Sequence, residues 1–344
     1  MKKGKFFGIV AFAIILLGFL CLFPLPIYIE TVGKAQNVAQ YVRVAQKKDR
    51  TAGSLMLTYV SVARATPVLY GASFFDKYAS RLPEEEVSGN ETDSEYERVQ
   101  TYYMEDAVNQ AKAAALRLAG KKYQQKYLGI YVLSLLQGST FKNKLAVGDT
   151  VTAVDGQYFS KTADFVAYLA KQKVRKQVTV TYLRNGKQRT VSGKTMKLPG
   201  TSRTGIGISL AERSQITTSE KITTDMEGIG GPSAGLMLAL QMYSQLANQD
   251  LKLGRKIAGT GTISADGTVG EIGGIDKKVV AAQRAGATLF FAPNNRVTAA
   301  ERKVDAQAVS NYKEAQAAVK KYHLKLKVVP VTNIKDALHY LKTH

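Results

Sequence analysis

An almost unbroken apolar run over residues 6–23 constrains this chain more than any other feature. In an α-helix, which rises about 1.5 Å per residue, a run of this length spans about 27 Å, just enough to cross the hydrocarbon core of a bilayer. Pro24 and Pro26 follow and are expected to end the helix. Because no face of the run is polar, a buried helix of a soluble domain is disfavoured. Residues 1–30 are therefore predicted to hold a transmembrane anchor.

The residues around the run indicate how it is oriented and processed. Three lysines lie within the first five residues, which predicts a cytoplasmic N-terminus and an extracellular remainder. A cleaved signal peptide needs a small-x-small site, and residues 21–26 offer none. A lipid anchor on Cys21 would usually need a small residue just before it, where this chain has Leu20. The pattern favours an uncleaved, single-pass anchor in the cell membrane.

Composition limits the cofactors and partners. The 344 residues are enough for two or three domains. The balance of 48 Lys+Arg against 27 Asp+Glu favours anionic surroundings. The lysines are spread along the chain without a zinc-finger or aromatic–glycine RNA motif, so we expect no nucleic acid partner. Cys21 is the only cysteine, and His323, His339 and His344 lack metal-ligand spacing, so we expect neither a metal nor another cofactor.

Residues 31–122 are predicted to form an N-terminal extracytoplasmic region built from a strand and a long helix. Residues 54–62 are apolar and β-branched, which is typical of a strand. Apolar residues recur at helical spacing over residues 104–118, and Gly120 is a candidate C-cap. The acidic, glycine-containing stretch 82–97 between them is expected to be a loop.

The pattern changes to short strands over residues 123–200. Residues 178–183 and 189–194 predict two strands joined by a turn at Asn185-Gly186, and Asp155-Gly156 predicts another turn. Because these segments are short and closely spaced, we expect a small β-rich domain.

This β-rich region resembles a bacterial PDZ domain in its Leu-Gly-Ile-Tyr stretch (128–131), its Leu-x-x-Gly-Asp pattern (145–149) and its turn at 154–156. The resemblance implies an exposed strand edge to which an extended peptide adds by backbone hydrogen bonds. The predicted peptide-binding loop consists of Leu128, Gly129, Ile130 and Tyr131. The N–H groups around Gly129 are the candidates for capture of a C-terminal carboxylate. A purely structural β-domain is the alternative.

Ser233 is the first candidate catalytic residue. Glycines and a proline fill residues 228–235, and the apolar residues that follow predict a buried helix. A serine at a helix N-terminus suits oxyanion stabilisation, but it also suits a plain N-cap, and this stretch alone does not decide between them. Residues 231–235 also fit the G-x-S-x-G elbow of hydrolases. However, no apolar strand precedes them, and neither His323 nor His339 is poised for a triad.

A second glycine-rich stretch, residues 257–286, complements the first. Together with Gly-Pro-Ser-Ala-Gly at 231–235, it resembles the proteolytic domain of Lon-type proteases, which would occupy residues 201–344. The resemblance implies that Ser233 is the nucleophile, Lys278 its dyad partner and Thr260 the residue that contacts the lysine.

The resemblance also places the oxyanion on the backbone N–H groups of Ser233 and Ala234. One departure is Gly230, which stands where many Lon enzymes have Asp. A second departure is that the printed chain carries no ATPase domain.

The proposed chemistry requires a neutral lysine. From its reference value of about 10.4, the pKa of Lys278 must fall by roughly three units for the amine to be neutral at pH 7. Burial beside Val279 and Val280 is expected to lower it. Lys277 lies about 100° away around the helix and is expected to face solvent.

The predicted fold is α+β and multidomain, with a transmembrane helix, a PDZ domain and an α/β Lon-type proteolytic domain. This combination resembles the ATP-independent, surface-anchored peptidases of Gram-positive bacteria, some of which mature secreted signalling peptides. It implies a serine endopeptidase for peptides or unfolded proteins, with the PDZ domain presenting substrate, and it allows a homo-oligomer. The competing hypothesis is a membrane-anchored PDZ peptide-binding adaptor with an inactive protease-like domain.

Overall fold

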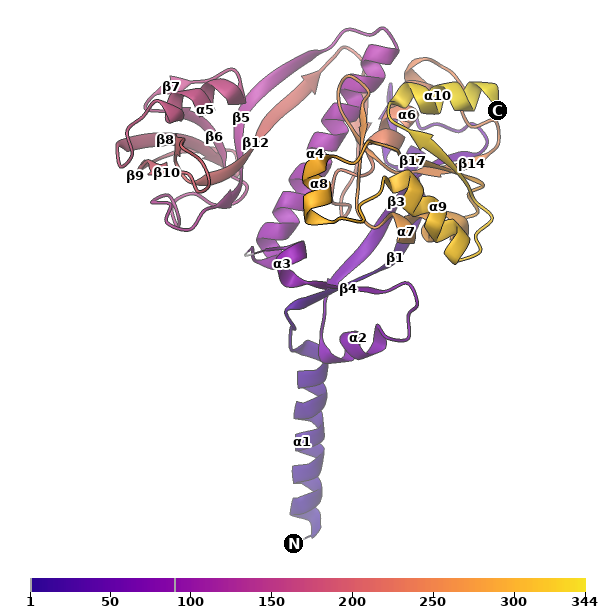
Figure 1. The fold of residues 1–344 in the computed structure, drawn as a ribbon, viewed down its shortest axis with the longest axis horizontal. Coiled ribbons are helices and arrows are strands. Elements are labelled where there is room, and N and C mark those ends of the chain that lie inside the picture. The colour runs from indigo at the N-terminus through magenta and orange to yellow at the C-terminus, as the bar shows by residue number, and fades with distance from the viewer. Residues whose placement is uncertain (1, 90) are drawn as a thin grey trace.

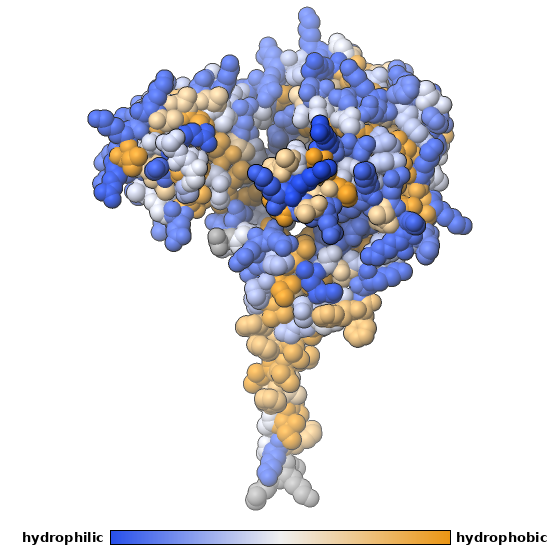
Figure 2. Space-filling model, viewed as in Figure 1, coloured by the Kyte–Doolittle hydropathy of each residue, from blue (hydrophilic) through white to orange (hydrophobic). Residues whose placement is uncertain are grey.

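The computed structural model describes residues 2–89 and 91–344 as a mixed α+β chain with an apolar helix at its N-terminus. Helix α1 (Lys2–Leu22) projects alone from the rest of the protein (Figure 1). Residues 4–22 within it are long and apolar enough to cross a membrane. Figure 2 shows the helix as an apolar shaft beneath a mostly hydrophilic body. The predicted helix over the apolar run is therefore confirmed.

The larger body is built on a six-stranded mixed sheet in the order β18-β17-β14-β3-β1-β4. Its strands are β1 (Ile27–Asn37), β3 (Ser54–Arg64), β4 (Ser80–Pro83), β14 (Lys256–Gly259), β17 (Leu289–Pro293) and β18 (Lys327–Val331). Strands β3, β14, β17 and β18 run parallel, and β1 pairs antiparallel with β3 and β4. The strand predicted over residues 54–62 is confirmed as β3.

The predicted separation of residues 31–122 from residues 201–344 is wrong, because both stretches share this sheet. Strand β3 pairs in parallel with β14, about two hundred positions later in the chain. Four consecutive β3 residues, from Leu55 to Thr58, are buried, so the strand needs cover on both faces. The β-rich domain is thus inserted into the larger one.

Helices cover both faces of the sheet. On one face α6 (Gly235–Leu246) and α10 (Ile334–Thr343) share a core with alternate residues of β3, and α4 (Asp93–Leu118) packs against α6. On the other face lie α7 (Ile275–Arg284) and α9 (Asn311–Lys321). The predicted helix over residues 104–118 is confirmed as part of α4. Gly120 adopts the left-handed conformation (φ 66°) just beyond its C-terminus.

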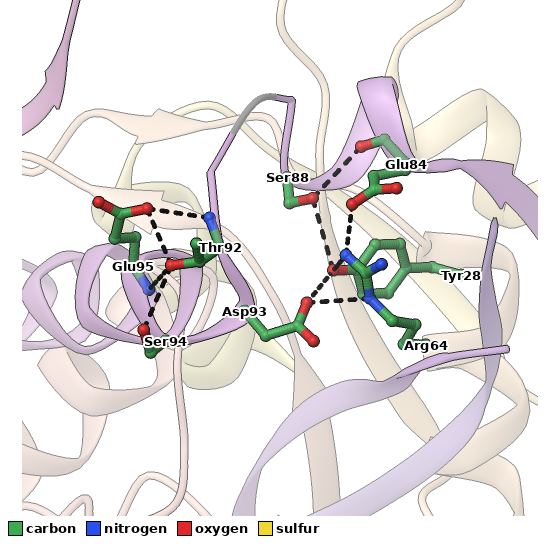
Figure 3. Close-up of polar contacts among 8 residues, drawn as sticks. All are labelled: Tyr28, Arg64, Glu84, Ser88, Thr92, Asp93, Ser94 and Glu95. Atoms are coloured by element: carbon green, nitrogen blue, oxygen red, sulfur yellow. Dashed lines mark hydrogen bonds and ion pairs between the residues drawn. The ribbon is translucent and has the colours of Figure 1, made fainter. Parts of the chain in front are cut away.

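The loop predicted over residues 82–97 is wrong, because this stretch holds the end of β4, helix α3 (Glu84–Val87) and the start of α4. Thr92 and Glu95 form a capping box that starts α4. Figure 3 shows this cap beside Arg64, which pairs with Glu84 and with Asp93. Acidic composition suggested a loop, but here the acids occupy first-turn positions, where the helix dipole favours them.

The smaller body contains a sheet in the order β12-β5-β6-β8-β9, with β7 paired to β6. The strands are β5 (Gln124–Leu135), β6 (Thr150–Val154), β7 (Gln157–Tyr158), β8 (Gln177–Arg184), β9 (Lys187–Lys194) and β12 (Ile208–Thr217), and the helix is α5 (Thr162–Ala170). The turns at Asp155-Gly156 and Asn185-Gly186 are confirmed, and all four residues have positive φ. Because β12 belongs to this sheet, the domain extends beyond its predicted end at residue 200.

The other short elements complete the chain. They are η1 (Val38–Gln40), β2 (Val42–Val44), α2 (Pro67–Ala72), β10 (Met196–Lys197), β11 (Thr204–Gly205), β13 (Ile222–Thr224), β15 (Thr262–Ile263), β16 (Val269–Gly270) and α8 (Ala299–Val304). Figure 1 shows α4 running between the two bodies, so one face of this helix looks toward each.

Candidate active site

A cleft of about 1300 Å³ opens between α4, β12, the loop before α6 and the start of α7. Ser233 and Lys278 both line it. Residues of β12 (213–216) form part of its wall.

Neither His323 nor His339 lines the cleft, and both are exposed. A His-based triad therefore has no histidine at this cleft. Among the described residues, no cluster of three or more acidic, His or Cys side chains could hold a metal ion.

The loop that carries Ser233 is held against α4. The N–H of Gly231 donates to the carbonyl of Gln100 at 2.9 Å, and Gly231 has a φ of 80°, which favours glycine. A Cβ on Gly230 would lie only 2.8 Å from the Gln100 Cβ. This close approach favours glycine at position 230.

The backbone of Ser233 is anchored through its carbonyl group. Its carbonyl accepts hydrogen bonds from Gly261 N–H at 2.9 Å and from Thr260 Oγ1 at 3.1 Å. Helix α6 starts two residues later, at Gly235. Within the part of the chain that the structure describes, the N–H groups of Ser233 and Ala234 donate to no protein acceptor. Two unpaired donors at a helix start suit a developing oxyanion.

Lys278 points its amine into a buried position beside Thr260. The lysine is only 3% exposed, and its Nζ lies 3.4 Å from Thr260 Oγ1. Burial lowers the pKa of Lys278 to about 8, although the nearby Glu30 carboxylate opposes the shift. Thr260 thus contacts both partners. Among the described residues, no hydrogen bond joins the Ser233 hydroxyl directly to the Lys278 amine. Apo sites often close such contacts only when substrate binds.

The expectation that Lys277 faces solvent is wrong. Its side chain is 3% exposed, and its Nζ lies 2.9 Å from Glu30 and 3.2 Å from Asp276. Burial alone would lower the pKa of Lys277, but these two carboxylates raise it. The physical reason is that α7 packs on β1 and β3, so the side of α7 that carries Lys277 also contacts protein.

We expect Lys277→Met to destabilise the fold by about 3–5 kcal/mol, because it leaves the Glu30 carboxylate, whose side chain is only 13% exposed, without its partner. The unpaired carboxylate should also raise the pKa of Lys278 above about 8. Denaturant unfolding measures the first effect, and the pH dependence of activity measures the second. The double variant Glu30→Gln/Lys277→Met removes both charges and should lose less stability. A single variant as stable as the wild type would contradict the prediction.

The residues predicted as a peptide-binding loop do not form a loop. Leu128, Gly129, Ile130 and Tyr131 lie inside strand β5. Ile130 and Tyr131 are paired to β12 on one side and to β6 on the other. A strand with neighbours on both sides has no free edge for a peptide. The predicted position of the carboxylate-binding N–H groups is therefore wrong.

The edge of the sheet next to β5 is β12, and the opposite edge is β9. The turn before β12 reads Gly-Ile-Gly-Ile (205–208), and Gly207 has a φ of 74°. Among the described residues, the N–H groups of Ile206 and Gly207 donate to no protein acceptor. Ile206 and Ile208 pack in one core with Phe165 of α5. A sequence signal for this turn exists, because Ile-Gly-Ile at 206–208 has the same apolar–glycine–apolar pattern as Leu-Gly-Ile at 128–130.

Two family models match the chain. Residues 107–195 match the PDZ domain, and residues 226–341 match the Lon protease (S16) C-terminal proteolytic domain. The second match includes Ser233, Thr260 and Lys278. The chain thus carries both domains that its sequence predicted, and the proteolytic domain supports a serine peptidase.

Curated relatives are Lon proteases, which this chain matches only in part. The Lon protease of Desulforamulus reducens is 46% identical over 65 residues, covering 19% of this chain and 8% of that protein. The Lon protease of Aster yellows witches'-broom phytoplasma is 30% identical over 106 residues, covering 31% and 11%. The matched part is thus about a tenth of each relative's length.

One solved structure is similar in sequence to about a quarter of the chain. The PDZ domain of the SdrC-like protein from Listeria monocytogenes is 29% identical, with a TM-score of 0.24, and the match covers 25% of this chain and 90% of that one.

Proposed function

We propose that this protein is a membrane-anchored serine endopeptidase, independent of ATP, in which Ser233 is the nucleophile and Lys278 the general base. The observation that carries the proposal is the buried Lys278 amine, which contacts Thr260 and belongs to a residue that lines the same cleft as Ser233. A serine hydroxyl needs a neighbouring base to accept its proton, and a desolvated lysine can be that base near neutral pH.

The reaction would proceed in two halves. Neutral Lys278 takes the proton of Ser233 Oγ as this oxygen attacks the scissile carbonyl carbon. The oxyanion that forms accepts hydrogen bonds from the N–H groups of Ser233 and Ala234. The lysine then gives its proton to the leaving amine, and the peptide bond breaks. In the second half, Lys278 deprotonates a water that attacks the acyl-enzyme. The bond from the acyl carbon to Ser233 Oγ then breaks as Lys278 returns its proton to that oxygen, and the acid product leaves as a carboxylate after giving its proton to solvent.

Independence from ATP and action outside the cell complete the proposal. The printed chain has no G-x-x-x-x-G-K-[S/T] phosphate loop, since Gln188 replaces the glycine needed before Gly193-Lys194-Thr195. Lys2, Lys3 and Lys5, which precede the apolar run of α1, favour an extracellular catalytic domain. The purified full chain should cleave an unfolded protein in nucleotide-free buffer. Comparison of peptides in the culture medium of cells with wild-type protein or Ser233→Ala would identify the substrates. A wild-type chain that cleaves only with ATP would contradict the proposal.

The PDZ domain would present substrate through the outer edge of β12. At residues 212–216 this edge is covered by α4, because Asn109 bonds the carbonyl of Ser214 and the N–H of Ile216. The part of the β12 edge next to the Gly-Ile-Gly-Ile turn stays free, and the substrate peptide would pair with it as an added strand beside α5. Residues 213–216 of the same strand line the catalytic cleft, so β12 connects the free part of the edge with that cleft.

We expect a peptide with a free C-terminal carboxylate to bind at least about tenfold more tightly than its amide, because each hydrogen bond to a charged group contributes roughly 1.5–3 kcal/mol. The measurement is titration of the full chain carrying Ser233→Ala, which prevents cleavage, with a valine-terminated hexapeptide and its C-terminal amide. Fluorescence anisotropy of a dye at the peptide N-terminus reports binding. Equal affinities would show that the turn at 205–208 does not capture a carboxylate.

A further inference from the structure

The segment between β3 and β4 exposes an apolar face that no other part of the described chain covers. It contains α2 and the turn after it, residues 67–79, which we call the aromatic ledge. Val68, Gly71, Ala72 and Phe75 are all exposed. The spacing of Val68, Gly71 and Ala72 (i, i+3 and i+4) places them on one face of α2, and Phe75 lies in the turn that follows. Phe75 is 94% exposed and the adjacent Phe74 is 60% exposed. Adjacent aromatic rings in water are unusual unless something covers them.

The ledge lies at the membrane end of the protein. Leu25, just after α1, donates to Ala65 at 2.8 Å, and Ala65 donates to Ile27 at 2.8 Å, so the start of α2 is tied to the end of α1. The two helices are in direct contact. Figure 1 shows α2 beside the end of α1 that joins the body. In Figure 2 the apolar surface of the shaft continues onto this underside of the body.

The polar residues of the ledge suit a headgroup region. The Arg81 guanidinium lies 4.3 Å from the centre of the Phe74 ring and donates to the Ser73 carbonyl at 3.1 Å. Lys77 lies over the Tyr78 ring. Aromatic rings flanked by Lys and Arg are typical of the membrane–water interface, where the rings enter the acyl boundary and the cations meet lipid phosphates.

We infer that the aromatic ledge is a second membrane contact, in which Phe74 and Phe75 enter the headgroup–acyl boundary beside the point where α1 leaves the bilayer. This inference rests on the proposed role of α1 as an anchor. One helix alone leaves the body free to rotate and tilt above the membrane. A second contact fixes which side of the body faces the lipid, and with it the orientation of the catalytic cleft.

The chain contains no tryptophan, so a single introduced tryptophan reports on its own surroundings. The experiment compares three full-length variants in lipid nanodiscs: Phe75→Trp on the ledge, Phe12→Trp in α1 and Tyr158→Trp in β7. All three positions are strongly exposed in the structure, at 94%, 66% and 68%, and each change is conservative, so the fold should be kept. Brominated lipids quench a tryptophan that touches the acyl chains.

We expect Phe75→Trp to emit at shorter wavelength than Tyr158→Trp and to lose most of its emission to bromines placed shallow in the acyl chain. Phe12→Trp should be quenched by bromines placed deep, and Tyr158→Trp by neither. If Phe12→Trp is quenched but Phe75→Trp behaves like Tyr158→Trp, the anchor stands and the ledge inference is wrong. A protein partner on this face would give that result. If Phe12→Trp is not quenched, α1 is not a membrane anchor, and the inference that the aromatic ledge contacts the membrane is wrong as well.

Discussion

Replacing Ser233 with alanine is expected to reduce peptide cleavage by a factor on the order of a million, which leaves no measurable activity. The Ser233 side chain is the proposed nucleophile, so without its hydroxyl the proposed acyl-enzyme does not form. The change removes one oxygen at the mouth of the cleft and leaves the anchoring bonds of the loop intact, since these are made by backbone atoms of Ser233 and Gly231. The variant should therefore fold and unfold like the wild type.

Cleavage of an unfolded protein and labelling by a serine-reactive phosphonate are the two measurements for this variant. Ser202→Ala, an exposed serine remote from the cleft, is the matched control and should keep both signals. A Ser233→Ala chain that still cleaves would place the nucleophile elsewhere. A wild-type chain that binds peptides but neither cleaves nor takes the label would favour the adaptor hypothesis.

Replacing Lys278 with methionine is expected to abolish cleavage and, at the same time, to stabilise the fold. A pKa lowered from 10.5 to about 8 means that the buried ammonium costs roughly 3 kcal/mol at neutral pH, at 1.36 kcal/mol per unit. Methionine keeps the length and the apolar stem without that charge. An inactive variant that is more stable than the wild type cannot be explained by misfolding.

The stability difference should depend on pH in a defined direction. Below about 8 the folded wild type carries the buried charge, so the penalty is fully present. Between about 8 and 10.5 the amine is neutral in the folded state but still protonated in the unfolded chain, so the stability of the wild type rises toward that of Lys278→Met. Denaturant unfolding at two pH values measures this. Lys335→Met, at an exposed position on α10, should show neither effect, and a destabilised Lys278→Met would contradict the prediction.

The parts of the fold and site that follow from local patterns could be predicted from sequence. The apolar run, the hairpins and the stripe of α4 each depend on residues close together in the chain. The catalytic candidates come from two glycine-rich motifs whose spacing is characteristic. The structure brings Lys278 to 3.4 Å from Thr260, and Thr260 to the carbonyl of Ser233, so the buried threonine links the two candidates that line the cleft.

The features that could not be predicted depend on contacts between distant segments. The pairing of β3 with β14 joins two distant parts of the chain into one sheet, and no local sequence feature of either strand specifies its partner strand. Lys277 was expected in solvent because a lysine without a known partner usually is exposed, whereas Glu30 of β1 supplies the partner here. Strand β12 returns to β5 from beyond the predicted domain end, which moves the free edge away from Gly129.

The rate at which a serine-reactive phosphonate labels Ser233, followed as pH is raised through the neutral and alkaline range, tests the central claim most directly. If a neutral Lys278 activates the hydroxyl, the rate rises with pH along a single titration with a midpoint at about 8 and then levels off, and the Lys278→Met variant is not labelled at any pH. A rate that does not change with pH, or labelling of Ser233 that persists without the lysine, would contradict the dyad.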